Sequence, residues 1–225
     1  GAKIDLADKD KKTALMLAAE KGHHRVCDLL CYLLMRRGVK IDLVDNNGKT
    51  ALMLAAEKGH HRVCNLLIRR GAKIDLADKD GKTAFMLAAE NGHGEMCNSL
   101  IERGAKIDLV DNDRKTALML AAENGHDRVC DLLIRRGAKV DLADNNGKTA
   151  LISAAKNGHK EVCELLIERV AKLDAARENG WKALMLAAEN GHDRVCDLLC
   201  DSLIGRGAKI DLVDNNEKTA LMLAA

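Results

Sequence analysis

A block of eight residues, Thr-Ala-Leu-Met-Leu-Ala-Ala-Glu, recurs along this chain of 225 residues at nearly regular intervals. The block or a close variant of it starts at positions 13, 50, 83, 116, 149, 182 and 219, so successive copies lie 33 or 37 residues apart. Each of the first six copies is followed by Gly-His, with a Cys four residues after the His. A period of this length predicts small units that stack on their neighbours and do not fold alone.

Each repeat is expected to contain a turn and two short helices. In the second copy, Asp45-Asn46-Asn47-Gly48 predicts a tight hairpin turn. Thr50 is expected to cap a first helix, which Gly59 ends in the left-handed conformation. A second helix is expected from about residue 60 to 70, where apolar residues recur at helical spacing, and Gly71 marks its end. Neither helix is long enough to be stable alone, so each must be held by the next repeat.

This pattern resembles the ankyrin repeat. The resemblance covers the whole chain and rests on the 33-residue period, the Gly-His and Ala-Ala pairs, the double Leu and the closing Gly-Ala. It implies an all-α fold, a curved and elongated α-solenoid of stacked helix-turn-helix units with hairpin tips. One departure is systematic, since the family's Thr-Pro-Leu-His signature reads Thr-Ala-Leu-Met in most repeats and Pro is absent. We expect methionine to fill the space of the missing His, at Met16, Met53, Met86, Met119, Met185 and Met222.

The chain is interpreted as a single array over residues 1–225. Its repeats are expected at about 8–44, 45–77, 78–110, 111–143, 144–176 and 177–213, with a partial repeat at 214–225. The two 37-residue intervals each carry four additional residues, around 31–34 and 200–203, and so predict a longer second helix there. Neither end carries the polar cap that a free array normally has. We therefore expect a fragment of a longer array; the alternative is that the ends stack against another molecule.

The recurring His and Cys, at i and i+4 on one helix face, raise the question of a metal site. Zinc needs four ligands at about 2.0–2.3 Å, whereas stacked helices lie about 8–10 Å apart. We therefore expect neither a metal nor a cofactor, but a His that bonds across the loop and a Cys that packs in the core. The Cys residues are predicted to be free thiols, which indicates a cytoplasmic location.

Other function classes find little support. The net charge is +2 with no basic stripe, which argues against nucleic acid, and no apolar stretch is long enough to span a membrane. No phosphate loop or nucleophile elbow is present, and the recurring Glu residues do not converge on a reacting atom, so we expect no catalytic residues and no enzyme.

The resemblance implies a protein-interaction scaffold that binds another protein of unknown identity through its hairpin tips and concave first-helix face. Carried onto this sequence, the binding residues are Lys79, Asp80, Lys82, Glu90, Asn91, Asn112, Asp113, Lys115, Glu123, Asn124, Asn145, Asn146, Lys148, Lys156 and Asn157. Trp181 joins this set as a binding anchor, or it is a local apolar plug. The alternative is an architectural role: stacking end to end through the apolar ends of the array, or along a repetitive cytoskeletal lattice, which the small variation of these positions between repeats would suit.

Two repeats are expected to deviate. In the third, Gly94 and Ser99 should weaken the second helix, so hydrogen exchange should be faster at 94–101 than at 127–134. In the sixth, Ala175-Ala176-Arg177-Glu178 replaces the usual Leu-x-Asp-x, and Val170 stands where other repeats have Gly. The junction between the fifth and sixth repeats is therefore expected to be bent or loosened.

Overall fold

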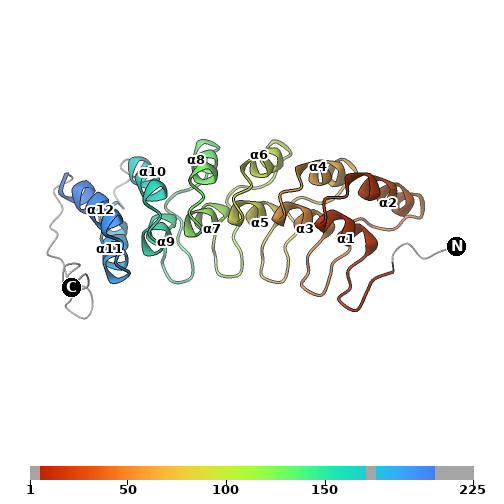
Figure 1. Ribbon diagram of the computed structural model, residues 1–225, viewed down its shortest axis with the longest axis horizontal. Coiled ribbons are helices and arrows are strands. Elements are labelled where there is room, and N and C mark those ends of the chain that lie inside the picture. Colours follow the sequence, from red (N-terminus) through yellow and green to blue (C-terminus); the bar gives the residue numbers. More distant parts are fainter. Residues whose placement is uncertain (1–5, 171–175, 206–225) are drawn as a thin grey trace. The chain divides into compact units, whose positions relative to one another are not determined.

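The computed structural model describes residues 6–170 and 176–205, and the chain divides into two units, residues 1–112 and 113–225. In its described part each unit consists of three helix pairs, one pair for each repeat (Figure 1). The first unit contains α1 (Ala14–Glu20), α2 (His24–Arg36), α3 (Ala51–Glu57), α4 (His61–Arg69), α5 (Ala84–Glu90) and α6 (Gly94–Glu102). The second contains α7 (Ala117–Glu123), α8 (Asp127–Arg135), α9 (Ala150–Lys156), α10 (Lys160–Val170), α11 (Ala176–Glu189) and α12 (Asp193–Gly205). The described residues form no β-strand, and the fold is an all-α solenoid of stacked helix pairs.

The helices of each unit form two layers. In the first unit α3 packs between α1 and α5, and α4 packs between α2 and α6. The second unit repeats this order, with α9 between α7 and α11 and α10 between α8 and α12. The hairpin loops project from the first-helix layer, on the side away from the second helices (Figure 1). Each repeat thus buries its apolar faces only against its own partner helix and the adjacent repeats.

A threonine begins each of the first five first-layer helices. Its hydroxyl accepts a hydrogen bond from the amide nitrogen three residues later, at 3.3–3.4 Å, which satisfies a donor that the helix start leaves unpaired. The pairs are Thr13 and Met16, Thr50 and Met53, Thr83 and Met86, Thr116 and Met119, and Thr149 and Ile152. In the first two repeats the methionine sulfur also accepts from the threonine amide, at 3.5 and 3.4 Å.

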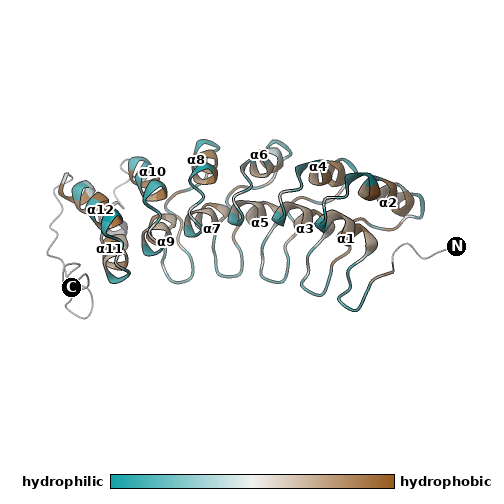
Figure 2. Ribbon diagram, viewed as in Figure 1, coloured by the Kyte–Doolittle hydropathy of each residue, from teal (hydrophilic) through white to brown (hydrophobic). Residues whose placement is uncertain are grey.

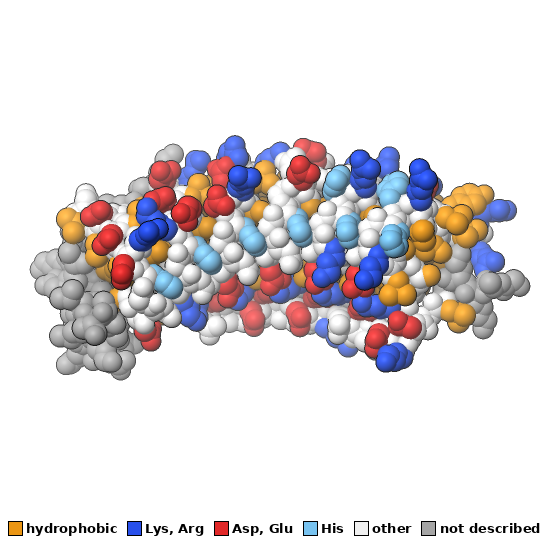
Figure 3. Space-filling model, in the orientation of Figure 1, with side chains coloured by type: hydrophobic (Ala, Val, Ile, Leu, Met, Phe, Trp, Pro, Cys, Tyr) orange, Lys and Arg blue, Asp and Glu red, His pale blue; other side chains and the backbone are white. Residues whose placement is uncertain are grey.

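The core is made of small and flexible apolar side chains. The methionines at 16, 53, 86, 119 and 185 are all buried, as expected, while Met222 lies outside the described residues. The Ala-Ala pairs, such as Ala55 and Ala56, are fully buried and let neighbouring backbones approach closely. Figure 2 shows polar residues along the hairpin loops and both apolar and polar residues on the second-layer helices. Lysine, arginine and acidic side chains are interspersed on the face shown in Figure 3.

The two helices with additional residues are longer, as predicted. α2 and α12 each have 13 residues, whereas α4, α6 and α8 each have nine. Four added residues make about one further helical turn, so the apolar face keeps its phase.

The sixth repeat starts differently from the others. Arg177 stands where the other repeats have the turn-forming Asp, and Lys182 replaces the capping Thr. Without these two groups the segment does not form a hairpin there, and α11 starts at Ala176 and runs for 14 residues instead of seven. Before it, α10 runs on to Val170 because Val disfavours the left-handed conformation that Gly71 adopts at φ +94°. The junction itself, residues 171–175, lies outside the described residues.

No helix among the described residues is long and apolar enough to cross a membrane.

Candidate functional site

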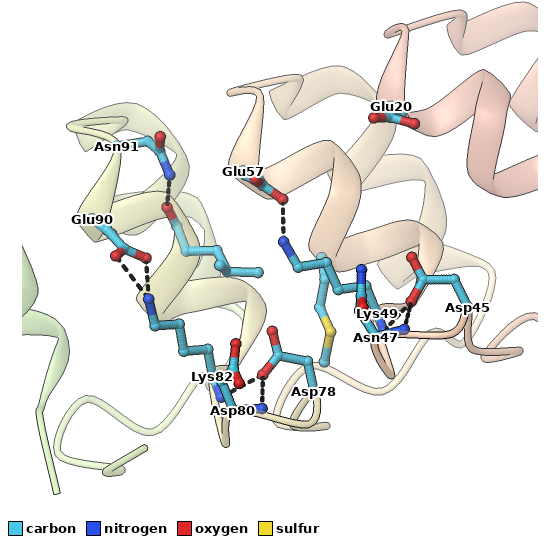
Figure 4. Close-up of polar contacts among 12 residues, drawn as sticks. Glu20, Asp45, Asn47, Lys49, Glu57, Asp78, Asp80, Lys82, Glu90 and Asn91 are labelled. Carbon is cyan, nitrogen blue, oxygen red and sulfur yellow. Dashed lines mark hydrogen bonds and ion pairs between the residues drawn. The ribbon is translucent and has the colours of Figure 1, made fainter. Parts of the chain in front are cut away.

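An aspartate organises each hairpin turn from within. In the third repeat the Asp78 carboxylate accepts hydrogen bonds from the amides of Asp80, at 3.0 Å, and Lys82, at 2.8 Å (Figure 4). Asp8, Asp45 and Asp144 make the same two bonds in their repeats. Asp45, Asp78 and Asp144 are buried, so these bonds satisfy a carboxylate that burial would otherwise penalise. The turn therefore holds the tip side chains in a defined arrangement.

Each tip is also bonded to the next one. In the first unit the amide of Asn46 donates to the Asp10 carbonyl at 2.9 Å, that of Lys79 donates to Asn47 at 3.0 Å, and that of Asn112 donates to Asp80 at 3.0 Å. In the second unit the Asn145 amide donates to the Asp113 carbonyl at 2.9 Å. One backbone hydrogen bond per repeat thus joins adjacent tips, and the exposed tip side chains of one unit form a regular row.

The last residue of the turn requires a left-handed backbone. Gly48, Gly81 and Gly147 supply it, with φ between +72° and +81°. At the equivalent positions of the first and fourth repeats stand Lys11 and Arg114, at φ +60° and +63°. Such a conformation is unfavourable for residues with a Cβ. The sequence contains a signal for this strain: Gly recurs at this position of the turn, and Lys11 and Arg114 are exceptions to that recurrence.

A lysine of the tip pairs with a glutamate at the end of the first helix. The ammonium-to-carboxylate distances are 2.8 Å for Lys12 and Glu20, 2.7 Å for Lys49 and Glu57, 2.7 Å for Lys82 and Glu90, and 2.6 Å for Lys115 and Glu123. Figure 4 shows the second and third of these pairs side by side. The hydrogen bond from Lys12 lowers the pKa of Glu20 below its ordinary value. These pairs give the first-helix face a repeating and locally neutral charge pattern.

The predicted binding residues divide into two groups by exposure. Ten are exposed: Lys79, Asp80, Asn91, Asn112, Asp113, Asn124, Asn145, Asn146, Lys156 and Asn157. Five are partly buried, namely Lys82, Glu90, Lys115, Glu123 and Lys148, and four of these form the pairs above. Four of the asparagine side chains donate to main-chain carbonyls: Asn91 to Leu87, Asn112 to Lys79, Asn124 to Leu120 and Asn157 to Glu123. Trp181 belongs to α11, but its side chain lies outside the described residues.

Four of the recurring histidines bond between repeats and not across the loop, which corrects the expectation from sequence. The ring Nε2 of His93 donates to the Glu57 carbonyl at 3.0 Å, and that of His60 donates to the Glu20 carbonyl at 3.1 Å. In the second unit His159 and His192 do the same to Glu123 and Lys156. On the face seen in Figure 3 the histidine side chains lie one after another within each unit. The partner carbonyl lies one repeat earlier, so no pattern inside a single repeat could identify it.

The cysteines are free thiols that pack in the core in five of the six repeats. Cys27, Cys31, Cys64, Cys97, Cys130 and Cys163 are buried, while Cys196 and Cys200 are partly exposed. Burial raises the pKa of Cys64 to about 12 and that of Cys27 to about 11, so few of these thiols ionise near neutral pH. Within the described part of the chain, no group of three or more His, Cys, Asp or Glu residues could hold a metal ion.

In the second unit, a small polar pocket of about 170 Å³ opens between the fourth and fifth repeats of the chain. It is lined by Asp113, Lys115, Glu123, Asp144, Asn146, Lys148, Ser153, Lys156 and Asn157. Ser153 occupies the position that Leu120 has one repeat earlier, and Lys156 occupies that of Glu123. Most of the lining was predicted as a binding surface from the sequence, but Ser153 was not, because a single Ser in a helix carries no signal by itself.

Comparison with known proteins agrees with this architecture. The family model described as "Ankyrin repeats (3 copies)" matches residues 1–78, 27–111, 64–144, 85–177, 118–205 and 170–225. The human ASB11 ankyrin repeat domain is similar in structure, with a TM-score of 0.80, 24% identity and coverage of 95% of this chain and 92% of that one. The ankyrin repeat domain of Bcl-3, a member of the IkappaB protein family, has a TM-score of 0.78 at 28% identity, with 96% of each chain covered. No curated protein matched the sequence. The chain belongs to the ankyrin-repeat family, whose repeats are in general protein-protein interaction modules.

Proposed function

We propose that this chain is a non-catalytic scaffold that binds a partner protein through its hairpin tips and the adjoining first-helix surface. We call the surface of this kind on each unit its tip face; of the fifteen predicted binding residues, those from Lys79 to Asn112 belong to the first unit and those from Asp113 to Asn157 to the second. The observation that carries the proposal is the bonding between adjacent tips, such as the Lys79 amide to the Asn47 carbonyl at 3.0 Å. A row of tips that is ordered before binding loses little conformational entropy on association.

The chemistry of the tip face suits a protein surface. Its exposed side chains are Lys, Asp and, most often, Asn, which together offer both donors and acceptors. In the third and fourth repeats the Lys and Glu pairs keep either sign of charge from accumulating, so most of the face favours a partner with mixed polar groups over a polyanion.

The proposal is tested by affinity capture from a cell lysate with the full chain and two charge-matched variants. Lys79→Ser with Asp80→Ser removes one charge of each sign from an exposed tip. Arg62→Ser with Glu95→Ser removes the same charges from exposed positions in α4 and α6. We expect quantitative mass spectrometry to show proteins that the tip variant loses and the helix variant retains. If both variants retain the same proteins, the tip face is not the binding surface.

A second candidate, end-to-end association with another copy of this chain, is favoured by an apolar surface on the first repeat. Val26 is 47% exposed in α2, Leu29, Tyr32 and Met35 are exposed in the same helix, and Leu17 is exposed in α1. The sixth repeat has nearly the same sequence, and there Val195, the equivalent of Val26, is 1% exposed. In that unit α11 and α12 pack against α9 and α10. A repeat stacked against α1 and α2 in the same way would cover the exposed surface of the first repeat. A second copy of the chain can supply such a repeat.

Sedimentation velocity over a concentration series tests this candidate. Self-association that weakens at least about tenfold in Leu29→Lys would support it, since the charge would lie in the apolar contact. A chain that stays monomeric at all concentrations would exclude it, whatever the tip face binds.

A further inference from the structure

The fifth repeat breaks the charge pattern of the first-helix face. In each of the first four repeats, the tip lysine has a glutamate partner at 2.6–2.8 Å. Lys148 is the tip lysine of the fifth repeat, and the position of its expected partner is occupied by Lys156. Among the described residues no carboxylate pairs with either ammonium group. Two positive charges therefore stand where the other repeats have a neutral pair.

The fifth repeat also has a smaller side chain beside these two lysines. Leu120 is 2% exposed in α7, whereas the equivalent residue in α9 is Ser153, whose side chain is smaller and carries a hydroxyl. The pocket of about 170 Å³ lies here, with Lys148, Ser153 and Lys156 in its lining. Its volume equals that of about five to six water molecules. It is thus large enough to admit the end of one side chain from another molecule.

The acidic residues of the lining are mostly engaged in other contacts. Glu123 pairs with Lys115 at 2.6 Å. The Asp144 carboxylate accepts from the amides of Asn146, at 2.8 Å, and Lys148, at 2.9 Å, as part of the turn. These two carboxylates are therefore held by bonds of their own, and Lys148 and Lys156 keep donors available to a ligand.

We infer that this pocket accepts the carboxylate of an Asp or Glu side chain from an acidic segment of the partner protein. The inference rests on the proposed function and names the chemistry that the partner must present. An incoming carboxylate takes the place of the glutamate that the fifth repeat lacks, and so re-forms the Lys and Glu contact seen in the other repeats. The Ser153 hydroxyl offers a further donor beside the two ammonium groups, and a charge-assisted contact of this kind favours an anionic over a neutral side chain.

Two substitutions close the pocket by following the chain's own repeat pattern. Lys156→Glu supplies the missing partner of Lys148, and Ser153→Leu restores the leucine of the other repeats. Both should fold, because each introduces the residue that its equivalent position already has. Arg128→Glu is the matched control: it makes the same charge change at an exposed position of α8, where α6 and α10 have Glu95 and Glu161.

The probes are random peptides displayed on phage and selected against the full chain, then synthesised with a fluorescent label for anisotropy measurements. We expect selected peptides to contain an Asp or Glu whose change to Asn or Gln weakens binding about tenfold. Lys156→Glu should weaken binding of the parent peptide by a similar factor, Ser153→Leu should also weaken it, and Arg128→Glu should not. The peptide with Asn or Gln in place of its Asp or Glu should lose little further affinity when Lys156 is changed to Glu, since the peptide change and Lys156→Glu remove the same contact.

The remaining outcomes separate this inference from the proposed function. Peptides that lose affinity for Lys79→Ser with Asp80→Ser but bind Lys156→Glu as well as the parent chain would overturn the inference and leave the scaffold function intact. Peptides that bind every variant equally, or a selection that yields no binder, would count against both.

Discussion

The imidazole Nε2 of His93 lies 3.0 Å from the main-chain oxygen of Glu57, which ends the first helix of the preceding repeat. Gly59 makes this approach possible, because a Cβ at that position would lie 2.8 Å from the His93 ring. Gly59 therefore has two roles: it adopts φ +72° at the end of the helix, and it leaves space for the ring of the next repeat. The same pair of residues recurs as Gly22 with His60, Gly125 with His159 and Gly158 with His192.

Gly59→Ala should destabilise the protein more than Gly71→Ala. Both glycines have positive φ, so each substitution costs about 1–2 kcal/mol of backbone strain. At Gly71 nothing lies within 4 Å of the added Cβ, whereas at Gly59 the His93 ring must move and its hydrogen bond is lost. We expect Gly59→Ala to cost about 1–2 kcal/mol more, measured by urea unfolding. If the two variants lose the same free energy of unfolding, the His93 ring moves aside without an energetic cost.

Arg114→Gly should stabilise the protein. Arg114 has φ +63°, and glycine adopts this conformation without the steric penalty of a Cβ. The gain should be about 0.5–1 kcal/mol, because glycine also raises the entropy of the unfolded chain. Arg114→Ala is the control, since it removes the side chain but keeps the Cβ. If both variants gain equally, the side chain and not the backbone is the source of the strain.

The contribution of Glu20 to stability should disappear in acid. Its pKa in the folded protein is lowered from 4.5, chiefly by the hydrogen bond from Lys12, so the folded state binds this proton more weakly than the unfolded chain. The stabilisation is complete above pH 4.5 and is lost as the pH falls through the lower folded value. The free energies of unfolding of the parent chain and Glu20→Gln should differ by less than about 1 kcal/mol at neutral pH and converge in acid. A difference that persists far below pH 4.5 would point to packing instead of charge.

The two cysteines of the sixth repeat should react first with a thiol reagent. Cys196 and Cys200 are partly exposed, whereas Cys64 and Cys97 are buried and burial raises their pKa to about 12. Since the thiolate is the reactive form and must also meet the reagent, native Cys196 and Cys200 should be alkylated before the other six. Peptide mapping after a short treatment with iodoacetamide measures the order. Uniform labelling of all eight would mean that local opening, and not exposure in the native state, controls access.

Hydrogen exchange in the third repeat remains a test of its expected weakness. Gly94 begins α6, and Ser99 replaces a leucine of the repeat, although its hydroxyl donates to the Asn65 side chain at 2.8 Å. A hydrogen bond at a partly exposed position contributes less than a packed leucine. Amides at 94–101 should therefore exchange faster than those at 127–134, and Ser99→Leu should slow them. Equal protection in the parent chain would contradict this prediction.

Much of the local structure followed from the sequence because its causes lie within a few residues. Thr50 caps α3 through the amide three residues later, and Gly71 ends the second helix of its repeat by its own conformation. The longer α2 and α12 follow from four added residues that keep the helical phase. The buried methionines follow from a recurring position on the apolar face of the helix.

The contacts between repeats required the tertiary structure. His93 was expected to bond across its own loop, yet its partner is a carbonyl 36 residues earlier. The pocket at Ser153 exists because the fourth and fifth repeats meet there, and the lack of a glutamate beside Lys148 becomes visible only once Lys115 is seen to reach Glu123. The sequence by itself thus determined the repeating unit, its helices and their caps, because those depend on neighbouring residues. Only the folded chain decided which groups of adjacent repeats meet, because that depends on how each repeat is positioned on the one before it.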